Sequence, residues 1–362
     1  MSDSPGNQKL SLLDILLRLF FKPKSSSETV TLGQPVLHPD NTTEPVRIMT
    51  SRVLLVIYEP IVDKSSGTKL SQFMNWNRPD DLANAFIQEI QEASNGYARY
   101  QIVQRVELNE FPAKLDGYRY DPQTYFEVMK GSQQPHQPDE VDYKAILTGL
   151  NVLSRIASHN IDEVWLFGFP YAGFYESTMG GAGAFWCNSQ PLTWSSGCSR
   201  RFVVMGFSYE REVGEMLHSF GHRAESILAQ TFHSQNFLAW VYNRDRSPAT
   251  VESNLNLFEQ FLCFDQIAPG KAAVGTIHNA PNSEKDYDYN NPRKVPSNCY
   301  QWYSFPVLKE DTREVNADEW GNGDMRLVHK WWLEHLPKVA GRISGVVNNW
   351  WQYIMDPNLV NL

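Results

Sequence analysis

Apolar residues follow two alternating periods along the chain. Strand-length segments rich in apolar residues occur at residues 52–58, 101–108, 163–168 and 202–207, and the first of them is a nearly continuous apolar run. Between and after these runs, apolar positions have helical spacing at residues 81–93 and 141–159, and again from Glu210 onward. Strands that alternate with helices are typical of an α/β fold with a mainly parallel sheet and flanking helices.

The pattern changes before residue 47 and again after residue 250, which divides the chain into three regions. Asp14 and Arg18 interrupt an apolar run near the N-terminus four residues apart, so the run predicts a short amphipathic helix. Such a helix could contact a membrane surface or a protein partner. The predicted regions are this N-terminal segment with a Pro/Ser/Thr-rich linker (1–46), an α/β core (47–250), and a loop- and Trp-rich C-terminal elaboration packed on the core (251–362).

The C-terminal region is distinguished by pairs of tryptophans in segments with helical spacing. Trp331 and Trp332 lie in the segment 325–336, and Trp350 and Trp351 lie in the segment 346–355. Aromatic faces can stack on sugar rings, but most large aromatic side chains are highly buried. The tryptophan pairs could therefore form a carbohydrate-binding surface, but burial in the hydrophobic core is the more common arrangement.

Composition narrows the function classes. The chain has 362 residues and a net charge of -9, with 32 basic against 41 acidic residues, which does not favour nucleic acid as a partner. It has no run of 18 uncharged apolar residues, and the N-terminus does not resemble a secretory signal, so the compartment stays open. The four cysteines include no CxxC pair, and either two disulfides or four buried thiols fit their spacing; they are Cys187, Cys198, Cys263 and Cys299.

The segments that leave the predicted strands carry polar side chains. In open parallel sheets, ligands bind at the carboxyl ends of the strands. Glu59, Glu176 and Arg211 follow three of the predicted strands, so we expect them at one edge of the sheet.

The most informative stretch is the helical segment after the fourth strand. At 100° per residue, Glu215, His218, His222 and Glu225 fall within a stripe of about 80°, and apolar residues occupy the other side. Histidines at i and i+4 can converge on one Zn²⁺ or another divalent metal ion, and a neighbouring Glu can add a ligand or act as a general base. The alternative is the ordinary solvated face of an amphipathic helix.

A polar loop offers further ligands. The segment 275–288 holds His278, Asp286 and Asp288, which have the right chemistry for a third or fourth metal ligand. Its polarity predicts a position outside the core. The competing interpretation is a surface loop in which Asn282 and Asp286 make turn hydrogen bonds.

The segment 214–222 is similar to the His-Glu-x-x-His helix of zincin metallopeptidases, but neither register is complete. Gly214 stands where the first His would be, and in the other register Ser219 replaces the general-base Glu. The resemblance therefore does not extend to peptidase activity. A second resemblance, to an uncharacterised group of bacterial proteins, covers most of residues 50–357 and implies no activity; it rests on KLDGYRY (114–120), GFYES (173–177), GEMLHSFGHRAES (214–226) and NNWWQYIMD (348–356).

Two other chemistries compete with a metal site. Ser208 lies between a strand and a helix, as in a nucleophile elbow, but Glu210 occupies the position that requires Gly, and helix capping by Ser208 is the simpler interpretation. Glu59 and Glu176 could act as paired carboxylates on a glycoside.

The pattern as a whole predicts a metal-dependent hydrolase that acts on peptide or glycan material. The expected metal ligands are His218 and His222, with Glu225 or His278 completing the set. Glu215 would be the general base, with Arg211 and Glu176 as further catalytic residues. The alternative is a non-enzymatic binding or attachment protein that recognises carbohydrate through its Trp-rich surfaces.

Overall fold

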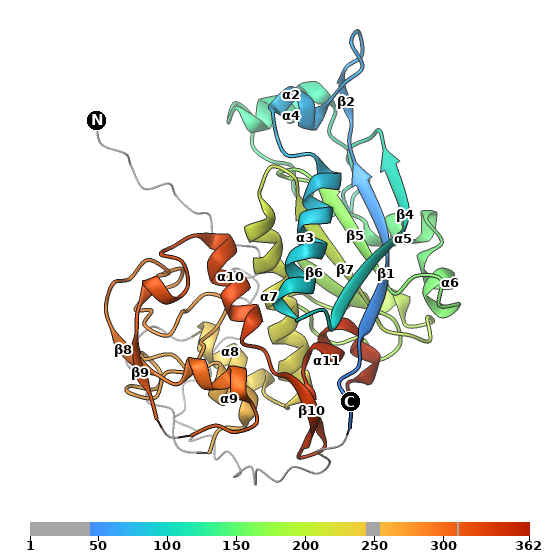
Figure 1. Ribbon diagram of the computed structural model, residues 1–362. Helices are drawn as coiled ribbons and strands as arrows, with labels where there is room; N and C mark the ends of the chain where they lie inside the picture. Colours follow the sequence, from blue (N-terminus) through green and yellow to red (C-terminus); the bar gives the residue numbers. More distant parts are fainter. Residues whose placement is uncertain (1–43, 244–253, 310) are drawn as a thin grey trace, which may run out of the picture.

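A five-stranded sheet forms the centre of the molecule (Figure 1). The computed structural model describes residues 44–243, 254–309 and 311–362. The strands lie in the order β4-β1-β5-β7-β6, the first four are parallel, and β6 joins β7 antiparallel at the edge. The predicted α/β fold with a mainly parallel sheet is confirmed. The strands are β1 (Met49–Tyr58), β4 (Ala98–Leu108), β5 (Glu163–Gly168), β6 (Ser177–Gly180) and β7 (Phe202–Ser208).

The middle strands are buried on both faces, which explains their continuous apolar sequences. Every residue of β5 is buried, as are the last six residues of β1. β4 lies at an edge of the sheet, and most of its side chains are partly or fully exposed. A strand covered on both faces needs apolar side chains at every position rather than at alternate ones.

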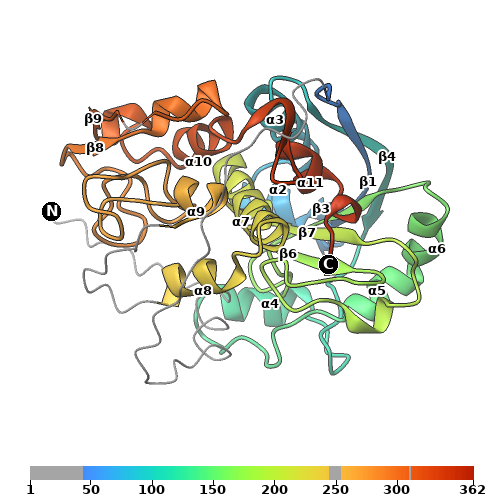
Figure 2. The same ribbon diagram turned by 90° about the horizontal axis from the view of Figure 1, so that it is seen from below.

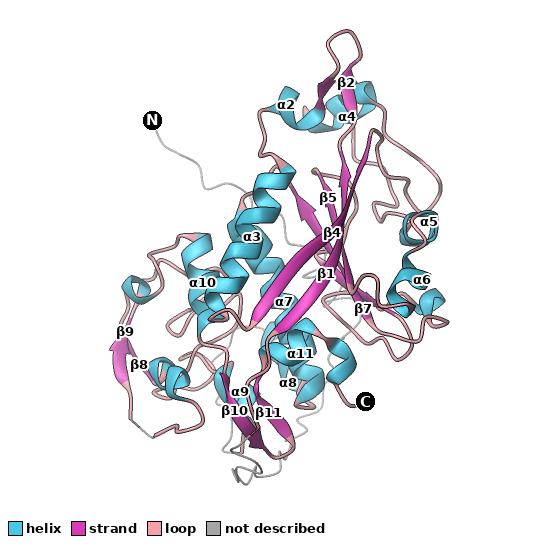
Figure 3. Cartoon of the chain, turned by 45° about the vertical axis from the view of Figure 1, so that its right-hand side comes forward, coloured by secondary structure: helices cyan, strands magenta, loops and turns pink. Residues whose placement is uncertain are grey.

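Helices cover the two sides of the sheet (Figure 3). Helix α3 (Pro79–Ala93) begins with Pro79 at its first turn and two aspartates beside it, which suit the positive end of the helix dipole. It packs beside α7 (Val213–Thr231), whereas the short helices α5 and α6 lie on the opposite side of the sheet (Figures 1 and 3). The remaining elements of this part are β2 (Ile61–Asp63), β3 (Thr68–Lys69), α2 (Leu70–Met74), α4 (Pro122–Met129), α5 (Tyr143–Gly149) and α6 (Val152–Ala157).

The C-terminal region packs on the core and encloses α7. Helix α10 packs against α7 and α3, and α11 packs against α7 and β1, so α7 lies between the sheet and the C-terminal region (Figure 2). The tryptophans of both pairs are buried, and none is more than 8% exposed. Further elements are α8 (Gln235–Asn243), α9 (Leu257–Phe261), β8 (Val295–Ser297), β9 (Arg313–Val315), α10 (Met325–Glu334), β10 (Lys338–Ile343), β11 (Val346–Asn349) and α11 (Trp351–Met355).

Three local expectations are wrong. The single helix expected over 141–159 is two helices, because Asn151 takes a left-handed conformation (φ 51°) that breaks the helix after Gly149. The helix expected over 346–355 begins as strand β11, which pairs with β10. Ser208 ends β7 rather than capping α7, whose N-cap is Glu212.

Other expectations concern the termini and the cysteines. The N-terminal amphipathic helix and most of its linker lie outside the described residues. All four cysteines are buried free thiols. Among the residues that the structure describes, no helix is long and apolar enough to cross a membrane.

Candidate metal centre

The polar stripe of α7 is buried rather than solvated. His218, His222 and Glu225 are only 7%, 3% and 1% exposed. An isolated amphipathic helix would present this stripe to water, but here the C-terminal region covers it. A buried polar group must be hydrogen-bonded or bound to an ion.

Three histidine side chains point their Nε2 atoms toward one another. His222 Nε2 lies 3.1 Å from His218 Nε2 and 3.0 Å from His278 Nε2. Each histidine offers one ligand nitrogen, and the three nitrogens lie within 4.8 Å of one another. Two nitrogens on one tetrahedral zinc ion, each bonded at 2.0–2.1 Å, would be about 3.3 Å apart. Two of the three nitrogen pairs therefore have nearly the spacing of ligands on one zinc ion, and the third lies within 4.8 Å.

Glu225 orients the His222 ring through a hydrogen bond at Nδ1, the ring nitrogen that does not face the other two histidines. Its carboxylate accepts a hydrogen bond from His222 Nδ1 (3.0 Å), and also from the Tyr242 hydroxyl (2.7 Å) and the Ile277 backbone amide (2.9 Å). Because an ionised carboxylate can only accept, Nδ1 of His222 carries the proton and Nε2 presents its lone pair to the other histidines. This carboxylate–histidine pairing is the usual arrangement behind a metal-bound histidine.

His329, on α10, orients His218 in the same way. His329 Nδ1 lies 3.1 Å from the Gly214 carbonyl, so this nitrogen donates, and His329 Nε2 lies 3.2 Å from His218 Nδ1. Burial lowers the pKa of His329 to about 4 and lowers the pKa of His218 well below its ordinary value, with the adjacent histidines adding to the second effect. Both rings are neutral at pH 7, so His218 donates from Nδ1 and keeps the lone pair of Nε2 for a cation.

The third histidine comes from the polar loop, and the expectation that this loop lies outside the core is wrong. His278 is 1% exposed and Asn282 is fully buried. Hydrogen bonds within and next to the loop pair many of its polar groups: Asn282 Nδ2, for example, donates to the carbonyls of Asn291 (2.8 Å) and Arg293 (2.6 Å). Trp332 Nε1 donates to the Gly275 carbonyl (2.9 Å), which ties the loop to α10. A polar segment can be buried when its own groups pair in this way.

Gly221 allows the loop to approach the helix. A Cβ added at Gly221 would lie 2.1 Å from Cδ1 and 2.6 Å from Cγ1 of Ile277. The glycine between the two histidines of α7 therefore lets the Ile277 side chain pack directly against the helix. Ile277 in turn brings its amide to Glu225 and places His278 at the centre.

The expected catalytic residues line a cleft at the carboxyl ends of β5 and β7. Glu176, Arg211, Glu215 and His218 all belong to the wall of this cleft, which has a volume of about 530 Å³. Glu215 precedes His218 by one turn of α7. The cleft therefore brings together one histidine of the cluster with the acidic and basic side chains expected beside it.

Other candidates lie elsewhere. Glu59 is buried, its carboxylate accepts the Ser71 amide (3.0 Å), and burial raises its pKa. The Asp288 carboxylate accepts the Glu284 amide (3.0 Å) and Asn291 Nδ2 (2.8 Å), as in an ordinary polar turn. Neither these two carboxylates nor Asp286 and Glu225 belong to the three-histidine group.

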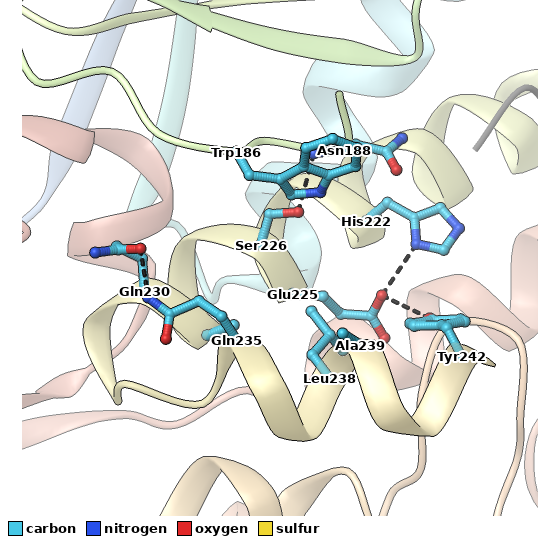
Figure 4. Close-up of a pocket in the computed structure, with 11 residues that line it drawn as sticks. Trp186, Asn188, His222, Glu225, Ser226, Gln230, Gln235, Leu238, Ala239 and Tyr242 are labelled. Atoms are coloured by element: carbon cyan, nitrogen blue, oxygen red, sulfur yellow. Dashed lines mark hydrogen bonds and ion pairs between the residues drawn. The ribbon is translucent and has the colours of Figure 1, made fainter. Parts of the chain in front are cut away.

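A smaller cavity adjoins His222. It has a volume of about 100 Å³, and Figure 4 shows Trp186, Leu238 and Ala239 around the Glu225–His222 pair. Asn188, in its wall, donates to the Glu176 carboxylate of the large cleft (2.7 Å). The two cavities thus adjoin different histidines of the cluster: His222 borders the small cavity and His218 borders the large cleft.

Sequence reasoning missed the groups that surround the three histidines. His329 lies in a helix noted only for its tryptophan pair, Tyr242 lies outside every candidate segment, and Tyr287 lies in the polar loop, where only histidine and aspartate were expected to be ligands. Periodicity could not find them, because each reaches the cluster from a different element. Comparison of the chain with protein-family models found no match, and comparison with curated protein sequences found none either.

Proposed function

We propose that the protein is a metal-dependent hydrolase with His218, His222 and His278 as its metal ligands. The observation that carries this proposal is the meeting of three buried Nε2 atoms, two of them with their lone pairs directed inward by hydrogen bonds at Nδ1. Imidazole nitrogens suit Zn²⁺ and neighbouring divalent transition metals. A buried carboxylate beside neutral imidazoles also favours a bound cation.

The cleft supplies the remaining parts of a hydrolytic site. Three histidine ligands leave coordination room for water or a substrate oxygen, as in catalytic zinc sites. In the proposed reaction Glu215 takes the proton from the attacking water, and Arg211 stabilises negative charge on the substrate. Glu176, held by Asn188, positions the substrate. A cleft of about 530 Å³ has room for a segment of peptide or glycan chain.

The Trp-rich C-terminal region gives less support to a carbohydrate-binding alternative. The side chains of Trp331, Trp332, Trp350 and Trp351 lie in the core, so they offer no stacking platform. A hydrolase therefore accounts for more of the observed chemistry than a binding surface does.

Metal content tests the proposal first. Protein purified after growth in zinc-replete medium should carry one metal ion per chain by elemental analysis, and His218→Ala should lose it. Because His218 is buried and bonded to His329, this variant should also lose about 1–3 kcal/mol of stability. The matched control is His136→Ala. His136 pairs with Asp116 and does not belong to the three-histidine cluster, so this variant should retain the metal. Metal-free wild-type protein would contradict the proposal.

Activity tests the second part. Glu215→Gln should keep the metal but lower the turnover of a cleaved peptide or glycan about 10²- to 10⁴-fold, the usual contribution of a general base. A chelator should abolish the same activity in the wild type. Full turnover by Glu215→Gln would show that another group takes the proton.

A further inference from the structure

Tyr287 has an unusual backbone conformation beside the histidine cluster. Its φ is 59°, in the left-handed region that bulky residues rarely adopt. The Tyr287 amide donates to the His278 carbonyl (2.9 Å), and the hydrogen bonds of the adjacent Asp288 carboxylate hold the same turn. A strained conformation that its surroundings maintain suggests that the side chain it presents has a function.

The strained turn brings the phenol oxygen to the centre. Tyr287 Oη lies 2.9 Å from His278 Nε2, the same nitrogen that faces His222 Nε2 at 3.0 Å. The Tyr287 ring lies 4.3 Å from the His278 ring and 5.9 Å from the His218 ring, measured between centroids. The oxygen therefore lies about as far from His278 Nε2 as His222 Nε2 does.

Two nearby tyrosines have different partners. The Tyr242 hydroxyl donates to Glu225, behind His222, and the Tyr289 hydroxyl donates to the Ile277 carbonyl, behind the loop. Tyr289 also lies 3.3 Å from His329 Nε2, which is not one of the three converging nitrogens. Tyr287 is the tyrosine whose oxygen approaches a converging nitrogen, and its side chain is partly exposed whereas the histidines are buried.

From this geometry we infer that Tyr287 is the fourth protein ligand of the centre, so that the donor set is three imidazole nitrogens and one phenol oxygen. The inference rests on the proposed metal site and adds to it. Zinc can accept a fifth ligand during catalysis, so a substrate oxygen could bind beside the phenol oxygen. Alternatively, the substrate oxygen could displace the phenol oxygen from the metal. Tyr287 then controls access to the metal from the exposed side of the cluster.

Copper spectroscopy of the full chain tests the assignment without any activity assay. Protein loaded with one equivalent of Cu²⁺ should show a phenolate-to-copper charge-transfer band in the visible region. Tyr287→Phe, which keeps the ring and loses only the oxygen, should bind one Cu²⁺ per chain and lose the band. Tyr303→Phe is the matched control: Tyr303 is 52% exposed and packs on His335, so this variant should keep the band at full intensity.

The outcomes separate the two proposals. Stoichiometric copper binding by the wild type without a charge-transfer band would overturn the role of Tyr287 and leave the three-histidine site standing. The same band in Tyr287→Phe would also overturn it. Failure of the wild type to bind copper, zinc or cobalt would overturn the metal site itself. Because the wild-type spectrum alone decides whether a phenolate is bound, the inference stays testable even if the variant folds poorly.

Discussion

Helix α7 and the polar loop 275–288 contribute to the same histidine cluster by opposite means. The helix contributes His218 and His222 through its regular 3.6-residue period, and its orientation is set by a large buried surface. The loop contributes His278 and Tyr287 through irregular backbone, and its shape is set by hydrogen bonds among its own polar groups. A helix can be placed by local sequence and an apolar face, whereas such a loop takes its shape only with its tertiary partners present.

This difference predicts that substitutions in the two regions have different effects on stability and on metal affinity. Changes on the core face of α7 should unfold the protein, because that face anchors the helix to the sheet. Changes at the boundary between helix and loop should lower metal affinity more than they lower stability. Four substitutions, taken in order of expected effect, test this division.

The largest effect is expected at Arg223, on the face of α7 that turns toward the sheet. Its guanidinium is buried and makes two bonds to the Glu163 carboxylate of β5 (3.0 and 2.9 Å) and one to the Ile354 carbonyl of α11 (2.9 Å). Arg223→Met should lower the free energy of unfolding by about 3–5 kcal/mol, because it leaves a buried carboxylate without its cation. Urea denaturation followed by circular dichroism measures this.

The control for Arg223 is the double variant Arg223→Met/Glu163→Gln. It removes the unpaired charge and should regain part of the lost stability. If the single variant were as stable as the wild type, α7 would not depend on this anchor, and the proposed division between core face and metal face would fail.

The second effect is expected at Gly221, where helix and loop meet. Gly221→Ala would force its Cβ against Ile277, a steric cost of about 1–3 kcal/mol that outweighs the gain of about 1 kcal/mol from better helix propensity. The displaced loop should also bind metal more weakly. In an Ile277→Ala background the same change should be tolerated, and a double-mutant cycle on stability and on zinc affinity measures the coupling. Equal effects in both backgrounds would show that the contact is unimportant.

The comparison also explains how much the sequence could predict. The alternation of apolar runs was sufficient for the parallel sheet, and the helical stripe was sufficient to bring His218 and His222 into one site. His278 was a candidate only by residue type, since nothing local indicates that its loop is buried. His329 could not be found at all, because its contact with His218 depends on how α10 packs on α7, a property of distant segments.

The third effect is expected at Glu225, which holds both His222 and the loop amide of Ile277. Glu225→Gln keeps the shape of the side chain but removes its charge, so zinc affinity should fall about 10- to 100-fold, as is usual when the group behind a metal-bound histidine is changed. Competition with a chromophoric chelator measures the affinity. Glu215→Gln, the same change one turn before His218, is the matched control and should bind zinc normally. A Glu225→Gln protein with wild-type affinity would show that His222 needs no orienting carboxylate.

The smallest effect is expected at Tyr242 of α8, which contacts Glu225 and is therefore one step further from the proposed metal site than Glu225 is. Its hydroxyl donates to the Glu225 carboxylate (2.7 Å), so Tyr242→Phe removes one of the three hydrogen bonds that hold this group. A single hydrogen bond to a charged group contributes about 1.5–3 kcal/mol when both partners are buried. The contribution is smaller here, because Tyr242 is partly exposed and the Glu225 carboxylate keeps its hydrogen bonds from His222 and Ile277. We therefore expect zinc affinity to fall by less than about tenfold. If Tyr242 acts only through Glu225, it should add nothing further in the Glu225→Gln background. Additive losses in the double variant would instead show that Tyr242 supports the centre directly, through its ring contacts with His222 and His278.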